Sequence, residues 1–145
     1  EALPIPETNV HRMPTELSNA SEVAKRYAET MTKVMKAEPF DLVLLGLGPD
    51  GHIASLFPGT HALTVTDSLT TDLYVEKFAS WRVTITYPVI NAARQVIVFI
   101  AGDTKAAIVS DIMRGGIEDL PVQRLAPQGE YYWYMDAAAA GRSAL

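Results

Sequence analysis

Residues 40–52 read Phe40-Asp41-Leu42-Val43-Leu44-Leu45-Gly46-Leu47-Gly48-Pro49-Asp50-Gly51-His52, an apolar run that passes directly into a glycine-rich turn. A short apolar run with almost no polar interruption predicts a strand that is buried on both faces, as in a parallel sheet covered by helices. The stretch therefore favours an α/β fold in which a central strand ends at a turn that carries polar side chains.

The rest of the chain alternates between helical and strand patterns. Before the central strand, apolar residues at helical spacing predict a helix that Ser18 or Asn19 caps and Pro39 ends. After it, we expect strands at 73–78, 81–86, 95–101 and 131–135 and a helix at 104–114. This order predicts one α/β domain over residues 1–145, with a mostly parallel sheet and helices on its faces.

The turn after the central strand holds the strongest candidates for ligand binding and catalysis. Ligands of open α/β sheets gather at the carboxyl ends of the strands. Gly46, Gly48 and Gly51 leave backbone exposed there, and successive backbone N–H groups in such a turn can hold an anion. His52 has the side chain most suited to general base catalysis near neutral pH, and Asp50 is placed to orient its ring.

The sequence of this turn is compatible with two other interpretations. Residues 46–51 match the dinucleotide-binding pattern G-x-G-x-x-G, but Pro49 removes one N–H donor. The break at Pro58-Gly59 also comes too soon for a full crossover helix, so we reject that interpretation. The second is a plain strand-to-helix turn with a solvated aspartate and histidine, which the position at a strand end disfavours.

Composition excludes several classes of protein. The chain has no cysteine, which rules out disulfides, thiolate catalysis and cysteine-based metal sites and fits a reducing compartment. The formal net charge of -5 argues against nucleic-acid binding, and the longest apolar runs are too short to cross a bilayer. His11 and His61 show no metal-type spacing with His52, and no nucleophile elbow surrounds Ser55.

After the strand and glycine turn, residues 50–58 carry Asp-Gly-His followed by Ala-Ser-Leu-Phe-Pro. This combination resembles the hallmark of the 6-phosphogluconolactonase family. Further similarity lies at 9–14, in the arginine strand at 81–86 and its following turn at 88–93, and in the lysine turn at 102–106.

The resemblance implies the three-layer α/β/α fold of sugar-phosphate isomerases and lactonases, and hydrolysis of 6-phospho-glucono-lactone in the oxidative pentose phosphate pathway. It implies that His52 activates the attacking water, that Asp50 supports His52, and that Arg82 and Lys105 hold the phosphate. No metal and no organic cofactor are expected, and the expected location is the cytoplasm.

One departure from the family concerns the N-terminal side. The chain begins at Glu1 and lacks the family's N-terminal part, which carries a further phosphate-binding arginine. We therefore expect this chain to be the C-terminal part of a longer family domain. A sheet without its first strands exposes an edge or an apolar face, which predicts self-association or pairing with the missing part.

Two rival functions stay open at this point. Glucosamine-6-phosphate isomerase/deaminase has a related Asp-Gly-His turn, but it continues toward Asn-Glu-Pro where this chain has Ser55-Leu56-Phe57-Pro58. The other rival is a non-catalytic module that binds a sugar phosphate, for which His52 would have no role in turnover.

Overall fold

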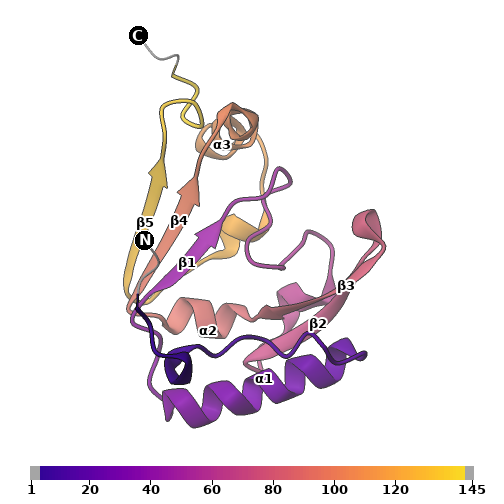
Figure 1. The fold of residues 1–145 in the computed structure, drawn as a ribbon. Coiled ribbons are helices and arrows are strands. Elements are labelled where there is room, and N and C mark those ends of the chain that lie inside the picture. The colour runs from indigo at the N-terminus through magenta and orange to yellow at the C-terminus, as the bar shows by residue number, and fades with distance from the viewer. Residues whose placement is uncertain (1–3, 143–145) are drawn as a thin grey trace.

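The computed structural model of the chain describes residues 4–142. Its central sheet has three parallel strands in the order β1 (Val43–Gly46), β4 (Gln95–Ile100) and β5 (Glu130–Met135). Figure 1 shows these strands side by side, with their carboxyl ends at the same edge of the sheet. The predicted α/β class with a parallel sheet is confirmed.

A hairpin forms a second, separate sheet. Its strands β2 (Thr70–Val75) and β3 (Ser80–Ile85) are antiparallel, and a 3-10 turn, η3 (Glu76–Phe78), joins them. The sequence prediction extended the first strand to residue 78, whereas the chain turns after Val75. Ala79 adopts a φ of 44° in the left-handed region, and this conformation closes the turn.

The long helix α1 (Ala20–Met35) packs against β2 and β3 (Figure 1). The side-chain oxygen of Asn19 accepts the backbone N–H of Glu22 at 3.1 Å, so Asn19 is the N-cap. The helix ends before Pro39, which corrects the predicted end. Lys36 has a φ of 50° and donates its N–H to the Thr32 carbonyl, and this left-handed cap terminates the helix.

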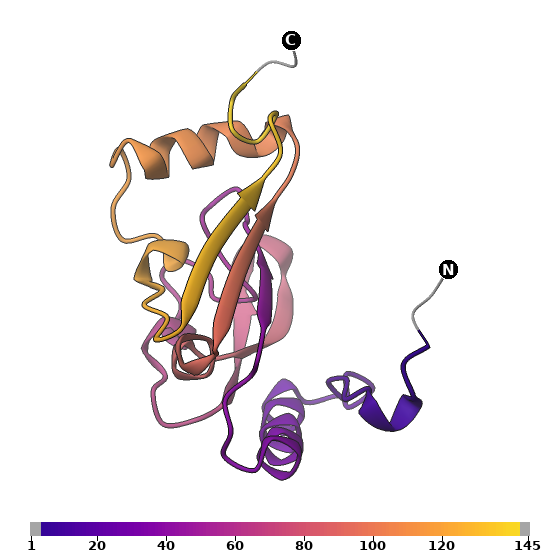
Figure 2. The same cartoon turned by 90° about the vertical axis from the view of Figure 1, so that its left-hand side faces the viewer.

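Two shorter helices flank the parallel sheet. Figure 1 shows α2 (Tyr87–Ala92) near the amino ends of the strands and α3 (Ala106–Met113) at their carboxyl ends. Four further 3-10 turns lie at Glu7–Asn9 (η1), His61–Thr64 (η2), Asp103–Lys105 (η4) and Pro121–Arg124 (η5). Figure 2 shows the segment before α1 extending away from the parallel sheet.

The hydrophobic core lies on one face of the parallel sheet. Val43, Val96 and Val98 point into it, and Ile53 and Leu56 from the loop after β1 have 0% exposure. The catalytic candidate His52 directly precedes Ile53, so core packing holds the loop that carries it.

The other face of the parallel sheet is open. Its side chains, which we call the open face, are Leu44, Ile97, Phe99, Tyr132 and Tyr134, and the strand register places them on one side of the sheet. Leu44 is 58% exposed and Phe99 is 52% exposed. The expectation that the central strand is buried on both faces is therefore wrong, because the described residues supply covering elements for one face only.

Candidate functional site

The turn between β1 and His52 is closed by its own backbone. The Gly48 N–H donates to the His52 carbonyl at 2.8 Å, and the Gly51 N–H donates to the Gly48 carbonyl at 3.1 Å. Gly51 has a φ of 74°, a conformation that L side chains rarely adopt. Because two of these N–H groups are already hydrogen-bonded, the anion-binding role of Gly46, Gly48 and Gly51 stays a prediction.

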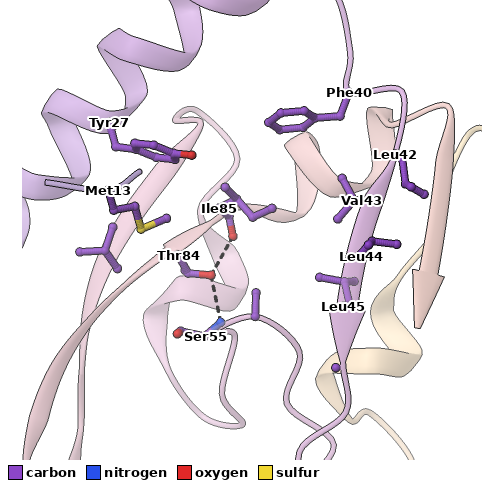
Figure 3. A pocket seen from close by; sticks show the side chains of 13 residues that line it. Met13, Tyr27, Phe40, Leu42, Val43, Leu44, Leu45, Ser55, Thr84 and Ile85 are labelled. Atoms are coloured by element: carbon purple, nitrogen blue, oxygen red, sulfur yellow. Dashed lines mark hydrogen bonds between the residues drawn. The ribbon is translucent and has the colours of Figure 1, made fainter. Parts of the chain in front are cut away.

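Contacts from two distant elements fix the position of this turn. The Gly51 carbonyl accepts the Val122 N–H at 3.1 Å, which ties the turn to η5. The Ser55 N–H donates to Thr84 Oγ1 at 3.1 Å, which ties the following loop to β3 (Figure 3). The loop is therefore held between segments that are far away in the sequence.

Asp50 and His52 form a direct pair. The His52 Nδ1 lies 2.5 Å from the Asp50 Oδ1. Since a carboxylate only accepts hydrogen bonds, Nδ1 carries the proton in a neutral imidazole, and the lone pair is on Nε2. The imidazole also lies against the Phe57 ring at a centroid distance of 4.1 Å. The predicted catalytic pair is thus brought together with Nε2 as its basic atom.

Lys77 also contacts Asp50, and the sequence pattern did not predict this contact. Its Nζ contacts the Asp50 Oδ2, so the carboxylate accepts from His52 on one oxygen and from Lys77 on the other. Asp50 and Lys77 are 27 residues apart and lie on different elements. A lysine in a hairpin turn carries no local sequence signal that would mark it as a partner of Asp50.

The environment of Asp50 favours its ionised form. Partial burial acts to raise the pKa of Asp50, but the hydrogen bonds from Lys77 and His52 outweigh it and lower that pKa to about 2. The carboxylate is therefore charged at neutral pH. A charged carboxylate can hold the ring orientation and stabilise the imidazolium that forms when His52 takes a proton.

Arg82 is connected to Asp50, His52 and Lys77 by a chain of aromatic contacts. Its guanidinium carbon is 5.6 Å from the centre of the Phe78 ring, and Phe78 packs edge-on against Phe57 at 5.9 Å. Arg82 donates to the neutral Ser80 Oγ at 2.7 Å. It is exposed on β3, so its fork of donors is accessible to a ligand.

Lys105 lies on η4, which directly follows β4 at the carboxyl edge of the sheet (Figure 1). The carboxylate of Asp136 accepts the Gly102 N–H at 3.0 Å and so anchors the turn that leads to Lys105. Among the described residues, no hydrogen bond or ion pair joins Lys105 to Asp50, His52 or Arg82. Lys105 shares the carboxyl edge of the parallel sheet with Asp50 and His52, whereas Arg82 lies on the separate hairpin sheet.

Two pockets border this region. One of about 610 Å³ is lined by Asp50 and Lys77 together with residues of η2 and β2. The other, of about 410 Å³, lies between α1, β1 and β3 and is mostly apolar (Figure 3). Of the predicted site residues, only Gly46 lines the apolar pocket, whereas Asp50 lines the pocket of about 610 Å³.

Two further properties concern the part of the chain that the structure describes. Residues 4–142 contain no group of three or more His, Asp or Glu side chains placed to hold a metal ion. None of the helices in the same range combines the length and apolar character that a membrane span requires.

Comparison with known families identifies the lineage of this site. The profile of the glucosamine-6-phosphate isomerases/6-phosphogluconolactonase family matches residues 1–133. The chain belongs to this family. The match covers the turn with Asp50 and His52, the hairpin with Arg82 and the turn with Lys105, which confirms the resemblance inferred from the sequence.

Curated relatives of this family are longer than the chain. The 6-phosphogluconolactonase of Synechocystis is 40% identical over 142 residues, which cover 93% of this chain and 58% of that protein. The human 6-phosphogluconolactonase is 38% identical over 144 residues, which cover 95% of this chain and 55% of that protein. The chain thus spans a little over half the length of these relatives.

Solved structures agree with this assignment. The 6-phosphogluconolactonase from Trypanosoma cruzi matches 94% of this chain and 60% of that chain, with a TM-score of 0.79 and 28% identity. A monomeric glucosamine-6-phosphate deaminase matches 86% of this chain and 56% of that chain, with a TM-score of 0.67 and 22% identity, which is a likeness of fold.

Proposed function

We propose that this chain carries the acid–base centre of a 6-phosphogluconolactonase and hydrolyses 6-phospho-D-glucono-1,5-lactone to 6-phosphogluconate, in the oxidative pentose phosphate pathway. The observation that carries the proposal is the Asp50–His52 pair at the carboxyl edge of the sheet, with the Nδ1–Oδ1 distance of 2.5 Å. Relatives at 38% and 40% identity that bear the name 6-phosphogluconolactonase support the choice of substrate.

The mechanism begins with substrate binding. Arg82 and Lys105 would hold the phosphate, Arg82 with two donors to two oxygens and Lys105 as a point charge. The backbone at Gly46, Gly48 and Gly51 would border the bound sugar. Holding the phosphate fixes the lactone carbonyl relative to His52, which lowers the entropic cost of the reaction.

The chemical step is acyl transfer to water. His52 Nε2 removes a proton from water while the water oxygen attacks the lactone carbonyl carbon, which gives a tetrahedral intermediate and an imidazolium. The carbonyl then reforms, the bond from that carbon to the ring oxygen breaks, and the imidazolium returns the proton to the ring oxygen. Asp50 stabilises the transient imidazolium, and one positioned base of this kind contributes roughly 10²–10⁴-fold to the rate.

The proposed reaction uses no metal or organic cofactor, because a base, a water molecule and phosphate-binding cations are sufficient for it. A chain without cysteine fits a reducing compartment, so we propose the cytoplasm as its location. The expectation that it does not bind nucleic acid rests on the net charge of -5.

The open face of the parallel sheet exposes apolar side chains that a partner could cover. We propose that residues 1–145 are the C-terminal part of a longer domain and that the remainder of that domain covers the open face. The support is that relatives extend well beyond the matched region and that Leu44, Phe99 and Tyr134 are 52–58% exposed. The 145-residue chain alone would then self-associate through the same face.

The experiment that tests the function measures hydrolysis of freshly prepared 6-phosphogluconolactone against the spontaneous rate. The variants are His52→Asn and, as a matched control, His11→Asn, which lies in the exposed segment before α1. We expect turnover that falls to the spontaneous rate in His52→Asn and is unchanged in His11→Asn. Equal turnover in all three proteins would refute the role of His52.

Assays of the same proteins with other ligands distinguish the lactonase from two rival functions. A glucosamine-6-phosphate deaminase would release ammonia from glucosamine 6-phosphate, and we expect no release. A non-catalytic module would bind 6-phosphogluconate without turning over the lactone. Binding of 6-phosphogluconate with no turnover would therefore replace the lactonase proposal by that of a binding module.

A further inference from the structure

Lys77 is placed by the hairpin, not by the turn that carries the catalytic pair. The register pairs Val75 with Ser80, and η3 with Ala79 closes the four residues between them. This geometry sets Lys77 at the tip of the hairpin, from where its side chain reaches Asp50. The contact therefore joins two elements that fold from separate parts of the sequence.

The ammonium of Lys77 also lies over two neighbouring aromatic rings. Its Nζ is 4.7 Å from the centre of the Phe57 ring and 5.0 Å from the centre of the Phe78 ring. Both distances are within the range of a cation–π interaction. Phe57 is the ring against which His52 packs, so Lys77, Phe57, Asp50 and His52 form one connected cluster.

The charges of this cluster bear on the protonation of His52. A lone carboxylate beside an imidazole favours the imidazolium, which is not a base. The ammonium of Lys77 offsets the charge of Asp50 and leaves the Asp50–Lys77 pair neutral. The hydrogen bond on Oδ2 also restrains the carboxylate, so that Oδ1 stays directed at His52 Nδ1.

We propose that Lys77 is a positioning residue of this site, which holds the Asp50 carboxylate toward His52 Nδ1 and offsets the charge of that carboxylate. The inference rests on the proposed role of His52 as the base. It assigns Lys77 no contact with substrate, and phosphate binding stays with Arg82 and Lys105.

Several other ionisable groups lie around Asp50. His52 comes from its own turn, Lys77 and Glu76 come from η3, and His61 comes from η2 across the pocket of about 610 Å³. Arg82 on β3 lies near the Phe78 ring. Because Lys77 is the cation in contact with Asp50, its removal has the largest expected effect on the charge balance at His52.

The test compares Lys77→Met, Lys77→Arg and the matched surface control Lys33→Met on α1. The first readout is the side-chain ¹⁵N spectrum of His52 as a function of pH, in the full chain without substrate. We expect the midpoint of protonation to rise by about 0.5–1 pH unit in Lys77→Met, as for the loss of one nearby unit charge. Lys77→Arg and Lys33→Met should stay close to the parent chain.

The second readout is the rate of lactone hydrolysis. In Lys77→Met, we expect kcat to fall about 3–10-fold more at pH 6 than at pH 8.5, because a rise of about 0.5–1 unit in the midpoint of His52 protonation removes up to that share of the free base at the lower pH. KM should stay within about twofold at both pH values, whereas loss of a phosphate ligand raises KM. A raised KM with an unchanged pH profile would show that Lys77 binds substrate and would overturn the proposal.

The two readouts separate this inference from the proposed function. An unchanged midpoint of His52 protonation in Lys77→Met, in a protein with a native circular dichroism spectrum, overturns the role of Lys77 even if the lactone is hydrolysed. A raised midpoint in a chain that hydrolyses no lactone supports the role of Lys77 in the charge balance and refutes the lactonase function instead.

Discussion

The imidazole of His52 lies so close to the backbone of Gly48 that a Cβ atom added there would be 1.9 Å from Nδ1. A contact this short cannot be relieved by a small adjustment, because the ring is also held by Asp50 and Phe57. Gly48 is therefore required for the orientation of the His52 imidazole.

The first prediction concerns this contact. We expect Gly48→Ala to displace the imidazole from Asp50 and to lower kcat by about 10²-fold or more, the usual contribution of a positioned base. The measurement is lactone hydrolysis together with the ¹⁵N spectrum of His52. Gly116→Ala is the control, since a Cβ there would meet its nearest atom, the Asp111 carbonyl oxygen, at 3.6 Å. A fully active Gly48→Ala would contradict the placement of the ring.

The second prediction concerns pH and stability. The pKa of Asp50 is lowered to about 2 in the folded chain from an ordinary value of 3.8. A carboxyl with a lowered pKa stabilises the fold above its unfolded pKa, and this contribution is lost as the pH falls from about 4 to about 2. Its size after solvent screening is on the order of 1 kcal/mol.

Urea unfolding between pH 2 and pH 6 measures this contribution. We expect Asp50→Asn to be less stable than the parent chain at pH 6, and the difference in unfolding free energy to shrink toward pH 2. A difference that is constant across this range would mean that ionisation of Asp50 does not stabilise the fold.

The third prediction concerns the phosphate. We expect Arg82→Met and Lys105→Met each to raise KM for the lactone by about 10-fold or more, because each removes a charge-assisted contact with the phosphate. Binding of 6-phosphogluconate should weaken to a similar extent, whereas Lys33→Met on α1 should leave both quantities unchanged. If one of the two site variants keeps the parent KM, that residue is not a phosphate ligand.

The fourth prediction concerns the open face. We expect the 145-residue chain to self-associate and to bind a hydrophobic dye, and the double variant Leu44→Glu/Phe99→Glu to weaken both. Leu44 and Phe99 are 58% and 52% exposed, so the substitutions should cost little folding stability. Val34→Glu is the control, because Val34 is 48% exposed on α1, away from the sheet.

Light scattering and dye fluorescence give the readouts for this fourth prediction. A monomeric parent chain with no dye binding would contradict the proposal that the open face is an association surface. Self-association that the double variant leaves intact would place the contact elsewhere.

The sequence by itself determined the class of fold and the family, and it predicted that Asp50 and His52 form a pair. These properties are local: the apolar run before Gly46 specifies a strand, and the short spacing from Asp50 to His52 brings two chemical groups together wherever the turn lies. The N-cap at Asn19 could be predicted for the same reason, since its hydrogen bond reaches only to Glu22.

Only the tertiary structure decided which faces are covered and which distant groups meet. The sequence pattern of residues 40–47 predicted a strand buried on both sides, but burial depends on what else packs there, and Leu44 is 58% exposed. The contact of Lys77 with Asp50 spans 27 residues and depends on where the hairpin turns after Val75. Such contacts follow from the packing of separate elements, which neither periodicity nor spacing along the chain specifies.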